Sequence, residues 1–151
     1  MRGDYAIGPV PDRRRYDQIE YGLLPKWEHH IVLGVRIIAR STLNGFVNNC
    51  VESRLRIGVK KHLDAWYAEA EKASWTDPAE LKAQFRTDSI VSAERVVFNI
   101  KGNDYRLVVA INYHYQILLI IWLGTHKEYD KIDVSTVAYV RERYANSSNS
   151  N

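Results

Sequence analysis

The sequence predicts a mixed α+β domain in which helices lie on a sheet of about four strands. The C-terminal half contains three apolar, β-type runs joined by two short polar breaks: RVVFNI, YRLVVAINY and ILLIIWL. A fourth β-branched run lies well upstream. Between it and the other three, apolar side chains recur at the helical spacing of three and four residues.

Length and composition are those of one ordinary globular domain. The 151 residues are 46% apolar and 26% charged, which allows a sizeable core but leaves little room for a second domain. The net charge of +3 and the pI near 9.0 permit contact with an anion such as RNA without requiring it.

Cysteine usage and hydropathy indicate a cytoplasmic protein. Cys50 is the single cysteine, so an internal disulfide is excluded and a reducing compartment is expected. No apolar run approaches the roughly 20 residues of a membrane span, and the N-terminus is too charged for a signal peptide. His29 and His30 stand alone, without further ligands at zinc spacing, so neither a metal nor another cofactor is expected.

Residues 1–34 differ in composition from the rest and are predicted to form a flexible arm. They hold three of the four prolines and four of the eight glycines, and they show no sustained period. Arg13–Arg15 is interpreted as a solvated charge cluster, with an RNA-binding arm as the alternative. Five basic and five acidic residues balance within the arm, so the excess of +3 belongs to the remaining residues.

A strand and a helix are predicted to follow the arm. Val35–Arg40 is short and β-branched, which favours a strand. Ser41 or Thr42 is expected to cap the helix, which ends near residue 50. The apolar face of this helix consists of residues three or four apart, namely Leu43, Phe46, Val47 and Cys50.

A second, longer helix is expected after Gly58, which is predicted to break the chain. Its apolar side chains have the spacing of one helix face: Val59, Leu63, Trp66, Tyr67, Ala70 and Ala73. Charged residues fill most of the other side, so the pattern predicts an amphipathic helix laid on the sheet. Trp66 is assigned to the core rather than to base stacking, because such tryptophans are usually buried.

The stretch DPAE at residues 77–80 predicts a short third helix that ends near Phe85. Asp77 can cap it, Pro78 suits the first helical position, and Glu80 can reach back to the amide of the capping residue. Residues 86–94 are polar and are predicted to be irregular.

The three apolar runs are predicted to be strands. In the first, Val96, Phe98 and Ile100 share one face. The break KGND at residues 101–104 predicts a tight hairpin, in which Gly102 or Asn103 takes a positive φ.

The second and third runs continue this sheet. Alternate residues from Tyr105 to Tyr113 share one face of the second strand. The third run, Ile117–Leu123, is apolar on both faces, so it is placed in the middle of the sheet, covered on both sides over at least part of its length. Residues 134–144 show weak helical character, and residues 145–151 are expected to form a disordered tail.

The turn GTHKEYD at residues 124–130 gathers residue types that suit RNA cleavage. His126 can move a proton near neutral pH. Lys127, together with Arg106, can stabilise a phosphorane-like charge. Tyr129 offers a ring for stacking, and it would share a face with His126 if the turn is helical. The alternative is a Thr-capped helical turn with a satisfied histidine and solvated charges.

The segment VVFNIKGNDYRLV at residues 96–108, followed by GTHKEYD at 124–130, resembles the HigB-type toxins of bacterial type II toxin–antitoxin modules. These toxins belong to the RelE/ParE superfamily. The resemblance implies a RelE/ParE-like α+β fold, with N-terminal helices packed on an antiparallel-rich sheet. It covers residues 35–133 as the toxin domain, which leaves 1–34 as an arm and 134–151 as a C-terminal helix and tail.

The resemblance also implies an activity and partners. The activity is that of an mRNA endonuclease, an mRNA interferase, which acts on translated message in the ribosomal A site by metal-independent attack of a 2′-hydroxyl. The partner is a cognate helix-turn-helix antitoxin that neutralises the toxin and mediates all contact with operator DNA.

Residue roles follow from the same resemblance. His126 is the acid or base, Arg106 and Lys127 hold the phosphate, and Tyr129 orients the base or the 2′-hydroxyl. Residues assigned to RNA binding are Asn103, Lys101 and Arg95. Residues assigned to shaping turns are Gly102 and Asp130, with Asn103 a further candidate for that role.

The chain departs from the family in two places. The arm is extra, either an addition or the result of a misplaced start, with Val35 as the alternative initiation site. Residues 113–116 also lack the glycine expected of a tight hairpin. Two other functions stay open. One is a non-catalytic ParE-like toxin that poisons a topoisomerase, and the other is an inactive module that retains only antitoxin binding and operator repression.

Overall fold

The computed structural model describes residues 34–86, 89–92 and 94–145. Internal contacts divide the chain into two units, Met1–Gly34 and Val35–Asn151, and the helices and strands named below belong to the second. The predictions for the arm, including Arg13–Arg15 and the pair His29–His30, lie outside the described residues. The predicted tail lies outside them from residue 146 onward.

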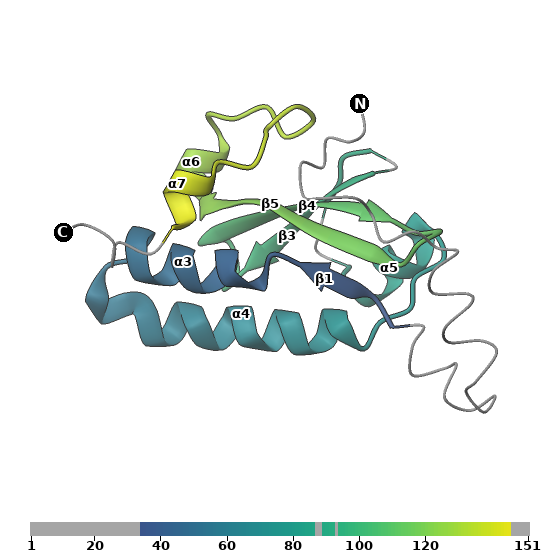
Figure 1. Cartoon of the computed structure of the whole chain (residues 1–151), viewed down its shortest axis with the longest axis horizontal. Helices are drawn as coiled ribbons and strands as arrows, with labels where there is room; N and C mark the ends of the chain where they lie inside the picture. Colours follow the sequence, from purple (N-terminus) through teal and green to yellow (C-terminus); the bar gives the residue numbers. More distant parts are fainter. Residues whose placement is uncertain (1–33, 87–88, 93, 146–151) are drawn as a thin grey trace. The chain divides into compact units, whose positions relative to one another are not determined.

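The described residues form a five-stranded sheet in the order β1-β5-β4-β3-β2 (Figure 1). The strands are β1 (Arg36–Ile38), β2 (Ser89–Ile90), β3 (Arg95–Ile100), β4 (Tyr105–Asn112) and β5 (Ile117–Thr125). β1 pairs in parallel with β5, and the other three pairings are antiparallel. The predicted α+β class is therefore confirmed. Strand β5 lies inside the sheet between β1 and β4, although the central strand of the five is β4.

Two details of the sheet differ from the prediction. Residues 89–90, expected to be irregular, pair as β2 with the free edge of β3. After β4, Gln116 takes the left-handed conformation, with a φ of 54°, where a glycine was expected. Its side-chain amide donates to the carbonyl of Tyr113 at 2.6 Å and to that of Trp75 at 2.5 Å. These hydrogen bonds offset the strain of the turn.

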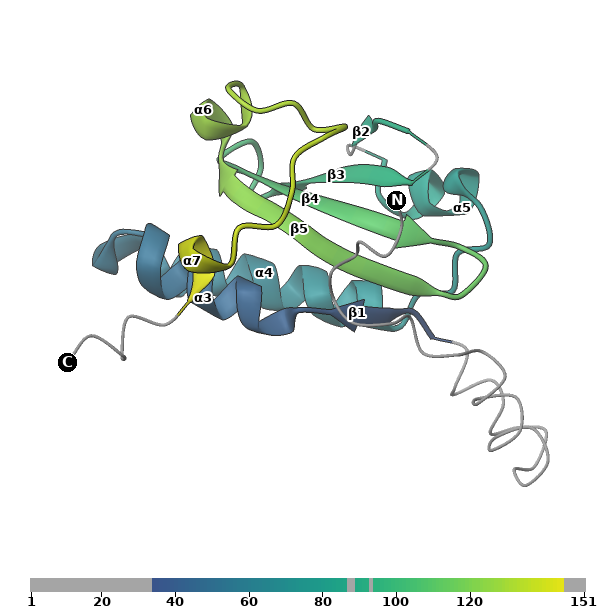
Figure 2. The same ribbon diagram turned by 45° about the horizontal axis from the view of Figure 1, so that its top comes forward.

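Helices α3 (Arg40–Cys50) and α4 (Arg56–Glu71), joined by the short 3-10 helix η1 (Ser53–Leu55), run along one face of the sheet (Figures 1 and 2). The cap predicted at Ser41 or Thr42 is wrong. The N-cap of α3 is Ala39, in the left-handed region, and no side chain caps the helix. Thr42 instead donates its hydroxyl to that of Tyr139 at 3.3 Å, which links α3 to the C-terminal segment.

The prediction that Gly58 breaks the chain is also wrong, because α4 runs straight through it. The apolar face of α4 is buried, as predicted, and it consists of Val59, Leu63, Trp66 and Ala70. This packing outweighs the low helix propensity of glycine, which costs a helix about 1 kcal/mol relative to alanine. Among the described residues, no helix has both the length and the apolar character needed to cross a membrane.

Helix α5 (Pro78–Gln84) begins much as predicted. The Asp77 carboxylate accepts from the backbone N–H of Glu80 at 3.0 Å, and Pro78 occupies the first turn. The Glu80 carboxylate, however, accepts from the N–H of Thr76 at 2.6 Å rather than from the amide of the capping residue. The start of α5 therefore also fixes the chain that leads into it.

The two faces of the sheet are buried differently. The helix face, which packs on α3 and α4, contributes to the main core through Val96, Phe98, Ile100, Tyr105, Leu107, Val109, Ile111, Leu118, Ile120 and Leu123. Trp66 is only 5% exposed and meets the ring of Phe98 edge-on at 5.3 Å. Its assignment to the core is confirmed, whereas Cys50, predicted for the same core, is exposed.

The opposite face, called the second face, consists of side chains that are buried but separate from the main core: Val97, Val108, Ala110, Leu119, Ile121 and Trp122. After α6 (His126–Tyr129), the C-terminal segment crosses this face and ends in α7 (Arg141–Tyr144) (Figure 2). The weak helix predicted over residues 134–144 is therefore limited to its last four residues.

Candidate active site at the ends of β4 and β5

The candidate site lies where the β3–β4 turn meets the end of β5. In the register of the sheet, Tyr105 pairs with Thr125 and Arg106 with Gly124. The backbone N–H of His126 donates to the carbonyl of Asp104 at 3.0 Å. The first residue of α6 is thus tied directly to the hairpin formed by residues 101–104.

Positive φ angles shape this hairpin. Gly102 has a φ of 65°, as predicted, and Lys101, not Asn103, shares the left-handed region with a φ of 54°. Gly102 suits this conformation because it has no side chain to clash with its own backbone. Lys101 also approaches Asp104, with 3.7 Å between Nζ and a carboxylate oxygen.

Arg106 projects from β4 onto the second face beside this hairpin. Its Nη1 donates to the carbonyls of Asn103 and Tyr105, each at 3.1 Å, and its Nη2 donates to the side-chain oxygen of Asn103 at 3.4 Å. Arg106 is 9% exposed, and these three acceptors among the described residues are all neutral. The hairpin therefore orients the guanidinium without cancelling its charge.

The turn after β5 is helical and is capped by Thr125, as in the alternative of a Thr-capped helical turn. The Thr125 hydroxyl accepts from the N–H of Glu128 at 3.2 Å, and the Glu128 carboxylate accepts from the N–H of Thr125 at 3.0 Å. This reciprocal capping box starts α6. His126 and Tyr129, three residues apart on this helical turn, lie on the same side of it.

The charged groups of α6 are open to solvent. His126 and Asp130 approach to 3.7 Å between Nε2 and a carboxylate oxygen, with side chains 50% and 60% exposed. The pair is an ion pair only when the imidazole is protonated. Lys127 is also exposed. Asp130 ends the helix, with its N–H donating to the carbonyl of His126 at 3.1 Å.

Tyr129 connects α6 to Arg106 and to Trp122. The guanidinium carbon of Arg106 lies 5.9 Å from the centre of the Tyr129 ring, within the range of a cation–π contact. The Tyr129 and Trp122 ring centres are 6.4 Å apart. The guanidinium carbon of Arg143 lies 5.5 Å from the centre of the Trp122 ring. The two rings therefore lie between two guanidinium groups, and these four side chains are called the rim of the site.

A β-bulge directs Trp122 to this rim. Val108 pairs with Trp122 and Val109 with Ile120, so Ile121 is an extra residue in β5. Strict alternation from Ile120 would place Trp122 on the helix face. The extra residue moves it to the second face, a change of direction that bulges commonly produce beside functional sites. The indole then fills the space above Gly124, where a β-carbon would collide with it.

The structure separates one predicted residue from the others. Arg95 lies at the opposite end of β3 from the hairpin, about 16 Å away at the usual rise of a strand. Its guanidinium donates to the carbonyls of Val137 at 2.9 Å and Val134 at 3.4 Å. Arg95 thus holds the C-terminal segment, and its assignment to RNA binding stays a prediction.

Sequence reasoning did not single out Trp122, Glu128 or Arg143 as members of this site. The capping box of Glu128 could have been read from the T-x-x-E spacing at residues 125–128. The position of Trp122 depends on the bulge, and that of Arg143 depends on tertiary contacts, so neither has a local signal. Among the described residues, no group of three or more His, Cys, Asp or Glu could hold a metal ion.

The mostly antiparallel sheet, covered by helices on one face, has the architecture of a RelE-like protein. Residues 59–132 match the family model of the HigB toxin, described as the RelE-like toxic component of a toxin–antitoxin system. Over this span, which contains most of α4, β3 to β5 and α6, the chain is similar to the HigB toxin family. No curated protein matches the chain.

Proposed function

We propose that this toxin is an endoribonuclease that cleaves translated mRNA in the ribosome. The observation that supports this activity most strongly is the arrangement of Arg106, Tyr129 and His126. An oriented guanidinium lies beside a phenol ring, and an imidazole shares that helical turn. These groups can bind a phosphodiester, hold a base and move a proton.

Arg106 is the phosphate-binding group in this proposal. A guanidinium carries five N–H donors in a fixed fork, and its contacts with Asn103 and Tyr105 use only some of them. Because those contacts are to neutral oxygens, the charge remains able to stabilise the oxygens of a pentavalent phosphorus. Asn103 orients this group, and the ammonium groups of the half-buried Lys101 and the exposed Lys127 attract the RNA backbone.

His126 transfers the proton. The 2′-oxygen attacks the adjacent phosphorus and the bond to the 5′-oxygen breaks, which gives a 2′,3′-cyclic phosphate and a 5′-hydroxyl. The imidazole either takes the proton of the 2′-hydroxyl or supplies one to the 5′-oxygen, and a water molecule carries the other proton. Asp130 lies 3.7 Å from the Nε2 of this imidazole, and Tyr129 holds the base or the 2′-hydroxyl in line.

The partners follow from the same proposal. A toxin–antitoxin family implies an antitoxin, which we propose to be a helix-turn-helix protein that neutralises the toxin and binds operator DNA on its behalf. The net charge of +3 is modest, so free RNA would bind weakly and in a salt-sensitive manner. This agrees with an enzyme to which the ribosome presents the message.

The test is expression in bacteria with and without the product of the neighbouring gene, with RNA 5′ ends mapped after induction. We expect growth arrest and cut message, both abolished by His126→Ala and by Arg106→Gln, with antitoxin binding intact. His62→Ala, which removes an exposed histidine of α4, is the matched control and should remain toxic.

Other outcomes would replace the proposal. A DNA-damage response with intact RNA would indicate the non-catalytic ParE-like toxin. Expression without growth arrest would indicate an inactive module that only binds its antitoxin and represses its operator. Full toxicity of His126→Ala would remove His126 from the mechanism.

A further inference from the structure

Helix α7 is anchored at the end of β5. Tyr144 is 4% exposed, and its hydroxyl accepts from the N–H of Leu123 at 2.9 Å and donates to the carbonyl of the same residue at 3.2 Å. A β-carbon at Gly45 in α3 would collide with the backbone carbonyl of Tyr144. The last helix therefore packs directly against both β5 and the backbone of α3.

Arg143 extends this anchor to the candidate site. Its Nη2 donates to the Glu128 carboxylate at 2.8 Å and to the carbonyl of Leu123 at 3.2 Å. The Glu128 carboxylate is the one that completes the capping box of α6. Arg143 thus contacts the start of α6 through Glu128, the end of β5 through Leu123, and the ring of Trp122.

These contacts matter because α6 is a single helical turn of four residues. A helix this short is unstable by itself and depends on its surroundings. Helix α6 is held by its capping box, by the hydrogen bond from the N–H of His126 to the carbonyl of Asp104 and by the ion pair of Glu128 with Arg143. The direction of the His126 and Tyr129 side chains therefore depends in part on α7.

We propose that α7 is a clasp that holds the active-site turn, with Arg143 as a positioning residue that acts through Glu128 and with Tyr144 as its anchor. This inference rests on the proposed function for its effect on RNA cleavage. Its structural half, that α7 orders α6, stands independently. The C-terminal helix is then required for cleavage although its side chains do not take part in the reaction.

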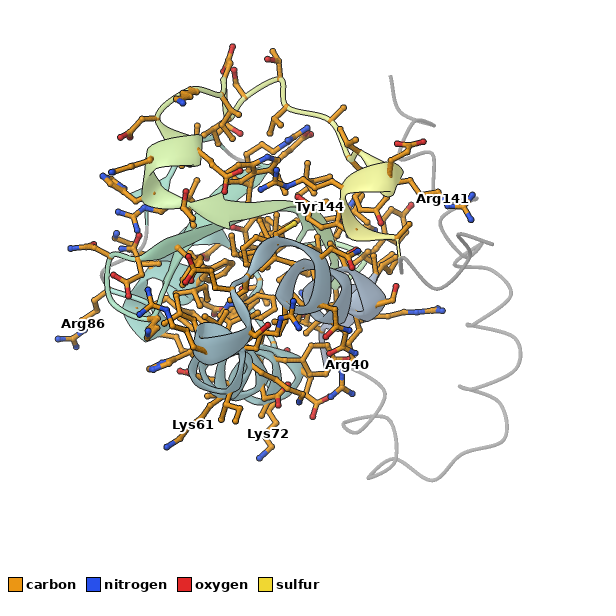
Figure 3. The ribbon with its side chains drawn as sticks, turned by 90° about the vertical axis from the view of Figure 1, so that its left-hand side faces the viewer. Arg40, Lys61, Lys72, Arg86, Arg141 and Tyr144 are labelled. Atoms are coloured by element: carbon orange, nitrogen blue, oxygen red, sulfur yellow. The ribbon has the colours of Figure 1, made fainter. Side chains whose placement is uncertain are left out.

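The chain offers a matched control on the same helix. Arg141 points from α7 into solvent, whereas Tyr144 lies between α7 and the sheet (Figure 3). The variants are Arg143→Ala, Arg143→Lys, Tyr144→Phe and Arg141→Ala, each prepared as the full chain. Lysine at position 143 can restore an ion pair with Glu128, but it lacks the planar guanidinium that lies over the Trp122 ring.

Two measurements separate positioning from general stability. Hydrogen exchange at the amides of Glu128 and Asp130 reports the order of α6, and amides of β3 and β4 report the rest of the domain. We expect Arg143→Ala to speed exchange in α6 by about tenfold or more and to leave the two strands unchanged. Tyr144→Phe should act in the same direction, Arg143→Lys should recover part of the loss, and Arg141→Ala should match the wild type.

Cleavage of a translated message is measured on the same proteins. Across the variants, the cleavage rate should decrease as the exchange protection of α6 decreases, while binding to the ribosome is retained. Unchanged exchange in α6 of Arg143→Ala would overturn the clasp, and so would an equal loss of protection across the whole sheet. A wild-type protein that cuts no RNA would refute the proposed function, and the exchange data would still decide the clasp.

Discussion

The two faces of the sheet hold their residues by different means. On the helix face, large apolar side chains interlock with α3, α4 and α5, as where Phe98 meets Trp66 at 5.3 Å and Phe85 at 4.9 Å. On the second face, the rim that carries Arg106 and Tyr129 is fixed by single hydrogen bonds and by contacts between guanidinium groups and rings.

The two kinds of contact contribute differently, because one supplies stability and the other fixes the orientation of side chains. Burial of an apolar side chain contributes about 1.5–3 kcal/mol without specifying a direction. A hydrogen bond contributes less, about 0.5–1.5 kcal/mol, but it fixes an orientation. The helix face should therefore control whether the domain folds, and the second face should control whether the rim is arranged for chemistry.

The largest expected effect is on the helix face. Phe98→Ala should lower the free energy of unfolding by about 3–5 kcal/mol, because it leaves a cavity between Trp66 and Phe85. Urea denaturation of the isolated protein, followed by circular dichroism, measures this change. The conservative control Phe98→Leu should cost less. A loss below about 1 kcal/mol for the alanine variant would contradict the distinction between the faces.

A smaller effect on stability, with a larger effect on activity, is expected at Gly124 on the second face. A β-carbon there would collide with the Trp122 ring and lie 3.0 Å from Nη2 of Arg143. Gly124→Ala should therefore cost about 1–3 kcal/mol, shift the fluorescence spectrum by moving Trp122, and reduce RNA cleavage more than Phe98→Leu does. Full cleavage with a shifted spectrum would show that the rim tolerates displacement of the indole, and an unchanged spectrum would show that the indole had not moved.

The same contrast explains what the sequence predicted well. The strands β3, β4 and β5 and the helix-face residues Val96, Phe98 and Ile100 follow from period-two patterning, because burial on one face forces that period. The cap at Asp77 and the glycine turn at Gly102 follow from local backbone chemistry. These features are determined within a few residues of the chain.

What the sequence did not predict depends on contacts distant along the chain. Plain alternation places Trp122 on the wrong face, because the extra residue Ile121 has no local signature. The start of α3 at Ala39 lacks a capping side chain. The contact between Arg143 and Glu128 spans 15 positions across the end of the sheet. The grouping of Arg106 with Tyr129 could be expected from the motif. The addition of the Trp122 ring and the Arg143 guanidinium to this group could not.

Gly58 provides the opposite test to Gly124, because it lies in α4, where an added β-carbon has space. Among the described residues outside its own helix turn, the nearest atom is the Cε of Lys101, at 4.0 Å. Gly58→Ala should stabilise the domain by about 0.5–1 kcal/mol, because alanine loses less conformational freedom in a helix. The midpoint of urea denaturation should rise at unchanged slope, and RNA cleavage should stay at the wild-type level. Destabilisation by this substitution would mean that the mid-helix glycine has a packing role.

The smallest expected effect is a pH dependence confined to the second face. Partial burial raises the pKa of Glu128, but hydrogen bonds from the Thr125 backbone and the Arg143 guanidinium outweigh it, so the pKa lies below the usual 4.5. A carboxyl with a lowered folded-state pKa contributes stability above its unfolded value, and this contribution is lost as pH falls through the folded value.

Protection of the α6 amides should therefore be constant above about pH 4.5 and decrease at lower pH, while amides of β3 and β4 remain protected over the same range. Because the Glu128 side chain is 42% exposed, solvent screening keeps the change modest. Glu128→Gln removes this titrating group, so α6 in that variant should exchange faster at neutral pH and should lose the acid dependence. If β3 and β4 open together with α6 in acid, the two faces unfold as one unit, and the rim is no more easily disturbed than the core beneath it.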